Sequence, residues 1–106
     1  DAFGHLILSI RYYHDSASVY LLPTALAVLA MLFDRLGHYE AAATTSGFAN
    51  TYAAAAIPEL NDAKAHLREV LGDERYESFA RKGEHMTTAA RVSYAFEQID
   101  RVRARL

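Results

Sequence analysis

The stretch DRLGHYEAAA, residues 34–43, decides how we interpret the fold of this chain. It follows a strongly apolar segment and leads into an alanine-rich one. Gly37 suits the position just after a helix, because glycine enters positive φ without strain. Tyr39 then begins a second helix, and Ala42 is small where the two helices cross. The stretch therefore predicts a helical hairpin whose structural corner is Gly37, Tyr39 and Ala42.

Apolar periodicity predicts helices on both sides of this corner. A stripe at helical spacing begins at Phe3 and predicts a first helix. Ser16 or Ser18 is expected to cap the second helix, which holds Pro23 in its first turn and runs to the corner. A break at Pro58 separates the third helix from the rest. The third helix is expected in the middle of the packing because its residues are small: Ala41, Ala42, Ala43, Ser46, Gly47 and Ala49.

Three more helices are expected after the break. The fourth ends at Gly72, and Asp73 caps a short fifth helix that Gly83 closes. Thr87 or Thr88 begins the sixth. The inward-facing residues predicted on these helices are Leu60, Ala63, Leu67, Val70, Leu71, Tyr76, Phe79, Ala80, Val92, Ala95, Phe96, Ile99 and Val102. The sequence thus predicts one all-α domain over residues 1–106, with about six mostly antiparallel helices.

Composition excludes several classes of function. The chain has 106 residues, no cysteine and a formal net charge of −2. Without cysteine it has no thiolate chemistry. A slightly negative net charge is unfavourable for a domain that binds nucleic acid by itself. None of its glycines begins a phosphate-binding loop, so we expect no nucleotide cofactor here. The apolar run at residues 20–33 is too short to cross a membrane, and we interpret it as a core helix. We expect a cytoplasmic domain cut from a longer protein.

Part of the hairpin has the spacing of a tetratricopeptide repeat. Residues 26–33 match its first helix, and Gly37, Tyr39 and Ala42 match the turn and the first small residue of its second helix. Ser46 stands where the repeat has a large aromatic residue. Only one such hairpin is convincing, and an array needs at least three repeats, so we describe the chain as TPR-like.

Three segments carry a more specific resemblance. These are RLGHYEAAA (35–43), LGDERYESFARKGE (71–84) and MTTAARVSYAF (86–96). With them, roughly residues 19–100 resemble the C-terminal helical region of large bacterial ATPase-type transcriptional regulators. Those proteins combine a P-loop ATPase with a TPR-like region, and many add a LuxR-type helix-turn-helix or a cyclase domain.

The resemblance implies a non-catalytic domain. It would sense a ligand or partner and couple that event to neighbouring domains of the same chain. Homodimerisation through an exposed helix face is a further expectation. Three tyrosines are candidate partner or ligand contacts: Tyr12, Tyr13 and Tyr20.

Two patterns suggest catalytic or metal chemistry, and each has a simpler interpretation. Asp62, His66 and Glu69 share a helix face and resemble half a metal site. Weak ion pairs on a solvated face are the simpler explanation, and we prefer it. The run at residues 14–16 contains histidine, aspartate and serine, but a triad is defined by spatial roles rather than by adjacency. We therefore predict no catalytic and no metal site, with a small helical enzyme as an alternative.

The basic C-terminal end leaves a second alternative open. Arg101, Arg103 and Arg105 can stabilise the negative end of a helix, contact a phosphate, or lead into a linker. The last two helices, with residues 81–88 as the turn, resemble a helix-turn-helix. A DNA-binding module is thus the main rival to the interaction domain.

Overall fold

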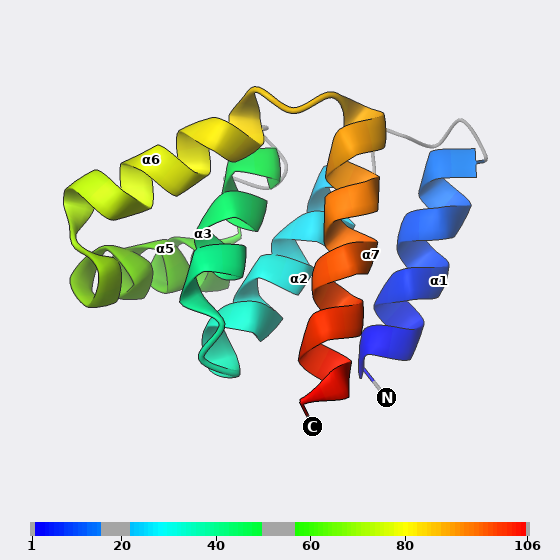
Figure 1. Cartoon of the computed structure of the whole chain (residues 1–106), viewed down its shortest axis with the longest axis horizontal. Coiled ribbons are helices and arrows are strands. Elements are labelled where there is room, and N and C mark those ends of the chain that lie inside the picture. The colour runs from blue at the N-terminus through cyan, green and yellow to red at the C-terminus, as the bar shows by residue number, and fades with distance from the viewer. Residues whose placement is uncertain (1, 16–21, 50–56, 106) are drawn as a thin grey trace.

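The computed structural model describes residues 2–15, 22–49 and 57–105 (Figure 1). These residues form six α-helices and one 3-10 helix, and no strand occurs among them. The all-α prediction is confirmed. The helices are α1 (Ala2–Asp15), α2 (Leu22–Arg35), α3 (Tyr39–Ser46), α5 (Pro58–Leu71), α6 (Asp73–Glu84) and α7 (Thr88–Ala104), with the 3-10 helix η2 (Gly47–Ala49) after α3.

Helix α3 lies at the centre of the molecule. It contacts α2, α5, α6 and α7, and residues 41–46 are all buried. Figure 1 shows α2 and α3 as one hairpin and α5 and α6 as another, with α1 and α7 side by side at the opposite end. The predicted central position of this small-residue helix is therefore confirmed.

Large apolar side chains surround α3. Those with less than 2% of their surface exposed include Ile10, Leu26, Leu29, Phe33, Phe48, Leu67 and Ile99. The ring centroids of Phe3 and Phe33 are 6.1 Å apart, which joins α1 to α2. The guanidinium of Arg11 lies 5.5 Å from the ring centroid of Phe96, which joins α1 to α7. The core thus spans the first and last helices, and the apolar run in α2 is a core helix, as predicted.

The predicted corner is present. Gly37 has φ +84°, and its N–H donates to the Asp34 carbonyl at 3.1 Å. The His38 N–H donates to the Phe33 carbonyl at 2.9 Å, which completes a Schellman motif. Ala42 is fully buried where α2 and α3 cross. The glycine therefore closes the end of α2 and reverses the chain into α3.

Two glycines set the spacing between α3 and α6. A Cβ atom at Gly83 would collide with the Thr44 carbonyl oxygen, and one at Gly47 would collide with the Ala80 carbonyl oxygen. Each segment thus supplies a glycine where the other supplies a carbonyl. The prediction that Gly83 closes its helix is wrong, because α6 continues to Glu84 and the glycine serves close packing instead.

Two further predictions are wrong for local reasons. Asp73 is the first residue of α6 rather than its cap; Gly72, with φ +87°, occupies the cap position without a side-chain hydrogen bond. Val70 is 44% exposed, because it lies at the edge of the buried stripe of α5 that Leu60, Ala63 and Leu67 form. Thr87 is confirmed as a cap, since its Oγ1 accepts from the Ala90 N–H at 3.1 Å.

Of the other expected helix boundaries, the two at prolines lie in the described residues and the two serine caps do not. Pro23 lies in the first turn of α2, and Pro58 is the first residue of α5, as predicted. Ser16 and Ser18, the expected caps of α2, lie outside the described residues.

Replacing Gly83 with alanine separates helix propensity from close packing. Propensity alone would stabilise the helix by about 1 kcal/mol. The contact with Thr44 instead forces α3 and α6 apart, and we expect a net loss of about 1–3 kcal/mol, a fall in Tm of several degrees. Thermal unfolding followed by circular dichroism measures this. Ser78→Ala on the exposed side of α6 is the control, and a Tm raised by Gly83→Ala would contradict the packing.

Substitutions at Gly37 test the corner. Valine is strained at positive φ, so Gly37→Val is expected to cost about 1–3 kcal/mol. Gly37→Asn should cost less, because asparagine tolerates the left-handed region. A Cβ atom here meets nothing within 4 Å. Any loss of stability in these variants therefore comes from backbone strain and not from a steric clash. Equal melting temperatures for the wild type and Gly37→Val would exclude this role.

Candidate functional site

A groove of about 350 Å³ lies between the corner and the C-terminal half of α7. We call it the corner groove. It brings together Gly37 and Tyr39 of the corner with Arg101 and Arg105 of the basic end. The full lining is Gly37, His38, Tyr39, Glu40, Ala41, Leu71, Gln98, Arg101, Val102 and Arg105. Two groups of residues singled out independently in the sequence thus meet in one place.

The charges of the corner groove are partly compensated. Arg101 donates to Glu97 at 3.0 Å, and Glu40 accepts from Arg75 of α6 at 3.0 Å. All four side chains are more than half exposed, so each pair contributes little to stability. Arg103 is exposed and is not part of the groove lining. Of the three arginines considered for a phosphate or linker contact, the structure places Arg101 and Arg105 beside the corner.

A histidine from α5 is held against the same corner. His66 Nδ1 lies 2.7 Å from Asp34 Oδ1, and the His66 ring meets the Tyr39 ring edge-on with centroids 5.8 Å apart. The partner of His66 is therefore Asp34 of α2 rather than Asp62 or Glu69 of its own helix. No group of three metal-ligating side chains occurs in the described part of the chain.

The carboxylate–imidazole pair has the geometry of two of the three members of a catalytic triad. Asp34 orients the ring through Nδ1, which leaves Nε2 for other partners. Among the described residues, no serine or threonine hydroxyl is hydrogen-bonded to His66. The contacts of His66 link α5 to the end of α2 through Asp34 and to the start of α3 through Tyr39. Sequence reasoning missed this link because Asp34 and His66 are 32 residues apart.

A buried pair of hydroxyls joins α3 to α6. Ser46 Oγ donates to the Ala43 carbonyl at 2.7 Å and lies 3.2 Å from Tyr76 Oη. Because the serine proton is used on the carbonyl, Tyr76 is the donor in the second bond. The small side chain of Ser46 leaves room for the Tyr76 hydroxyl. Burial raises the pKa of Tyr76.

Two arginines from neighbouring helices contact α6, one near each end. The Arg68 guanidinium lies 4.5 Å from the Tyr76 ring centroid and forms an ion pair with Glu77. At the other end, Arg91 of α7 donates to the carbonyls of Gly83 at 3.3 Å and Glu84 at 2.8 Å. A cation at a helix C-terminus is favourable because of the partial negative charge there. Helix α6 is therefore held by α5 at its start and by α7 at its end.

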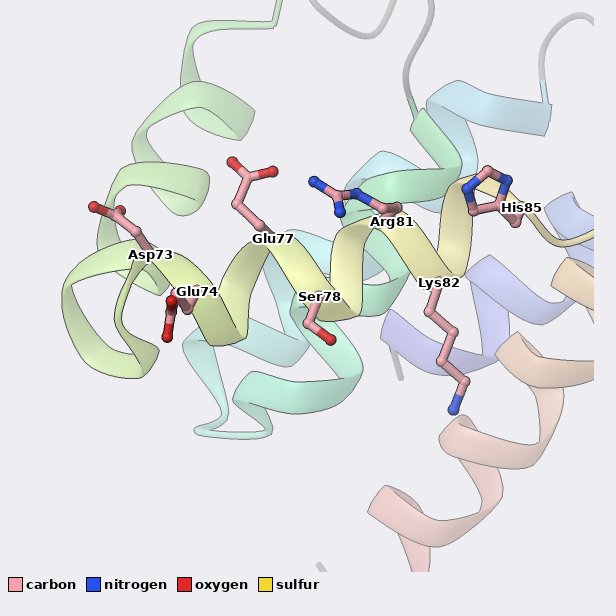
Figure 2. Close-up of a pocket in the computed structure, with 7 residues that line it drawn as sticks. All are labelled: Asp73, Glu74, Glu77, Ser78, Arg81, Lys82 and His85. Atoms are coloured by element: carbon pink, nitrogen blue, oxygen red, sulfur yellow. The ribbon is translucent and has the colours of Figure 1, made fainter.

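The outward surface of α6 is shown in Figure 2. Its polar and charged side chains are Asp73, Glu74, Glu77, Ser78, Arg81, Lys82 and His85. They come from α6 and from His85, which follows it, and they point in different directions: Glu77 and Arg81 lie on one side, and Ser78 and Lys82 on the other. Groups that diverge in this way do not converge on a common substrate atom. We interpret this surface as a solvated helix face.

An apolar groove of about 550 Å³ lies between α1, α2 and α5. We call it the apolar groove. Val28 is 42% exposed, and Met31 and Leu32 beside it are partly buried. The full lining is His5, Leu6, Val28, Met31, Leu32, Arg35 and Glu59. Charged or polar groups thus surround an apolar centre, which is the anatomy of a protein interface.

Of the three tyrosines predicted to contact a partner or ligand, the structure describes the side chain of Tyr12 alone. Tyr12 is 64% exposed on α1 and lines neither groove. The Tyr13 side chain and all of Tyr20 lie outside what the structure describes, as do the side chains of residues 14–16. These sites remain predictions.

Comparisons with known proteins identify no relative. No protein-family model matches the chain, and no curated protein or solved structure shows significant similarity to it. The resemblance to ATPase-type regulators therefore stays a prediction. Among the described helices, none is both long enough and apolar enough to span a membrane.

The buried Tyr76 and the half-buried Tyr94 predict how stability depends on pH. Burial is the main cause that raises the pKa of both Tyr76 and Tyr94. A raised pKa in the folded state means that the stabilisation is complete below the unfolded-state value of about 10 and is lost as the pH rises through the folded-state values. We expect the free energy of unfolding to fall above about pH 10.

Ultraviolet titration of tyrosinate checks this, together with denaturant unfolding over the same pH range. Tyr76→Phe and Tyr94→Phe should each remove one late-titrating group. A titration curve in which neither variant removes a delayed component would contradict the burial of these hydroxyls.

Proposed function

We propose that this chain is a non-catalytic, TPR-like interaction and sensor domain of a bacterial ATPase-type transcriptional regulator. In this role it acts in the cytoplasm, binds a partner or a neighbouring domain, and biases how the adjoining domains are arranged. The observation that carries the proposal is the apolar groove between α1, α2 and α5.

The apolar groove suits a helical segment of a partner. Val28 presents apolar surface to solvent, and Arg35 and Glu59 add opposite charges to the same lining. An amphipathic helix buries its apolar face in such a groove, while charged residues around it set orientation. Exposed apolar surface surrounded by polar groups marks interaction sites in general.

The two rival functions have less support. In a helix-turn-helix the second helix packs on the first, whereas here α6 packs mainly on α3 and α5, and α7 packs on α1 and α3. An enzyme needs a nucleophile or base with an oriented substrate position. In the part of the chain that the structure describes, the carboxylate–imidazole pair is Asp34 with His66, and it holds α5 at the corner.

The full gene product that contains this chain tests the proposal. We expect a P-loop ATPase domain in it, and we expect Val28→Glu to change its rate of ATP hydrolysis by at least about fivefold, a typical lower limit for coupling between sites. A glutamate in the groove places an unpaired charge where an apolar partner surface must dock.

Val70→Glu is the matched control. Val70 is exposed to a similar extent, 44% against 42%, but lies outside the apolar groove. Both variants should fold, since neither side chain is buried. A gene product without a P-loop would exclude the regulator, and equal ATPase rates in both variants and the wild type would exclude coupling through this groove.

A further inference from the structure

A small polar pocket of about 140 Å³ lies between the C-terminal end of α3, α5 and α6. We call it the hydroxyl pocket, because the Ser46 and Tyr76 side chains line it. Both are almost completely buried, with 2% and 4% of their surface exposed. It is separate from the apolar groove, and the two share no lining residue.

The direction of the hydroxyl protons is fixed by their partners. Ser46 gives its proton to the Ala43 carbonyl, and Tyr76 gives its own to Ser46 Oγ. Tyr76 Oη therefore keeps its acceptor capacity, and no hydrogen bond to that oxygen from another described residue uses it. A phenolic oxygen with a free lone pair accepts a proton from a ligand O–H or N–H.

The three cationic side chains that line the pocket differ in whether they are paired with other residues. Arg68 is paired with Glu77 and stacked on Tyr76. The side chains of Lys64 and Arg81 form no hydrogen bond or ion pair with any other residue that the structure describes. Lys64 is half-buried, and Arg81 is exposed. Two cations, one from α5 and one from α6, are thus available to a ligand.

The net charge of the lining is positive. Three cationic side chains, Lys64, Arg68 and Arg81, stand against the two carboxylates of Glu77 and Glu84. Since Arg68 already neutralises Glu77, the remaining field favours an anion near Lys64 and Arg81. A guanidinium and an ammonium supply the donors that carboxylate and phosphate oxygens accept.

From this arrangement we propose that the hydroxyl pocket binds a small oxyanion, a phosphate or a carboxylate group, between Lys64 and Arg81. The volume of about 140 Å³ is roughly that of five liquid water molecules, enough for one such group. A protonated phosphate oxygen, or a hydroxyl beside a carboxylate, donates to Tyr76 Oη. The pocket is the ligand site of a sensor if the proposed function holds, but its chemistry does not depend on that function.

Titration of the chain with inorganic phosphate, and separately with acetate at matched ionic strength, tests the site. Backbone amide shifts in nuclear magnetic resonance spectra are the readout. We expect saturable shifts around Ser46 and Tyr76 with a Kd near the millimolar range for at least one anion, as suits a ligand of a few heavy atoms. Saturation by phosphate alone, acetate alone or both identifies which oxyanion the pocket prefers.

Three methionine variants locate the binding. Lys64→Met and Arg81→Met should each raise the Kd about tenfold or more, because each removes a charge-assisted hydrogen bond. Lys82→Met makes the same change of charge on the other side of α6 from Arg81 and should leave the Kd within about twofold (Figure 2). Arg81 is exposed, so its variant stays folded even if Lys64→Met does not.

Two results would overturn the proposal. One is the absence of saturable shifts with either anion. The other is an equal loss of affinity in Arg81→Met and Lys82→Met, which would indicate general attraction to α6. Val28→Glu should bind the anion like the wild type, so failure here remains distinguishable from failure of the apolar groove as a partner site.

Discussion

The close crossing of α3 with α6 is the constraint on which the rest of the structure depends. Gly83 lies against the Thr44 carbonyl and Gly47 against the Ala80 carbonyl, so the two backbones meet with no side chain between them. Close packing of this kind gains dispersion contacts over both helices, but it leaves no space for a single added carbon. It places Ser46 within reach of Tyr76 and brings the end of α6 to Arg91 of α7. The α5–α6 hairpin is thereby fixed on the central helix, and the hydroxyl pocket exists because of this spacing.

A second set of contacts holds the corner of the α2–α3 hairpin. The Schellman motif at Gly37 satisfies the last carbonyls of α2, and the Asp34–His66 contact links that same helix end to α5. These contacts are polar and partly exposed, so they add little to the free energy of unfolding. Their main effect is on the orientation of α2, α3 and α5 at the corner. The molecule combines a rigid, glycine-spaced contact on one side of α3 with a hydrogen-bonded corner at its start.

The surfaces left open by this packing differ in chemistry. The apolar groove of α1, α2 and α5 presents Val28 and its neighbours to solvent, whereas the hydroxyl pocket is lined by cations and two buried hydroxyls. The first suits a macromolecular partner and the second suits a small anion. Both involve α5, which is joined to the corner through His66. A path of direct contacts therefore runs from the pocket through α5 and α2 to the groove.

The sequence by itself determined the local features of this protein. The helices followed from the apolar periodicity, and several of their boundaries from Gly37, Pro58 and Thr87. These features act on the backbone within a few residues, so the local sequence is enough to recognise them. The small residues at 41–47 also indicated a central helix. Only the tertiary structure decided that Gly83 is a packing residue rather than a helix end, that Val70 faces solvent, and that His66 pairs with Asp34. It alone brought Arg101 and Arg105 to the corner and Lys64 to Tyr76. These relations join residues far apart in the chain, and no periodicity in the sequence encodes the crossing geometry that brings them together.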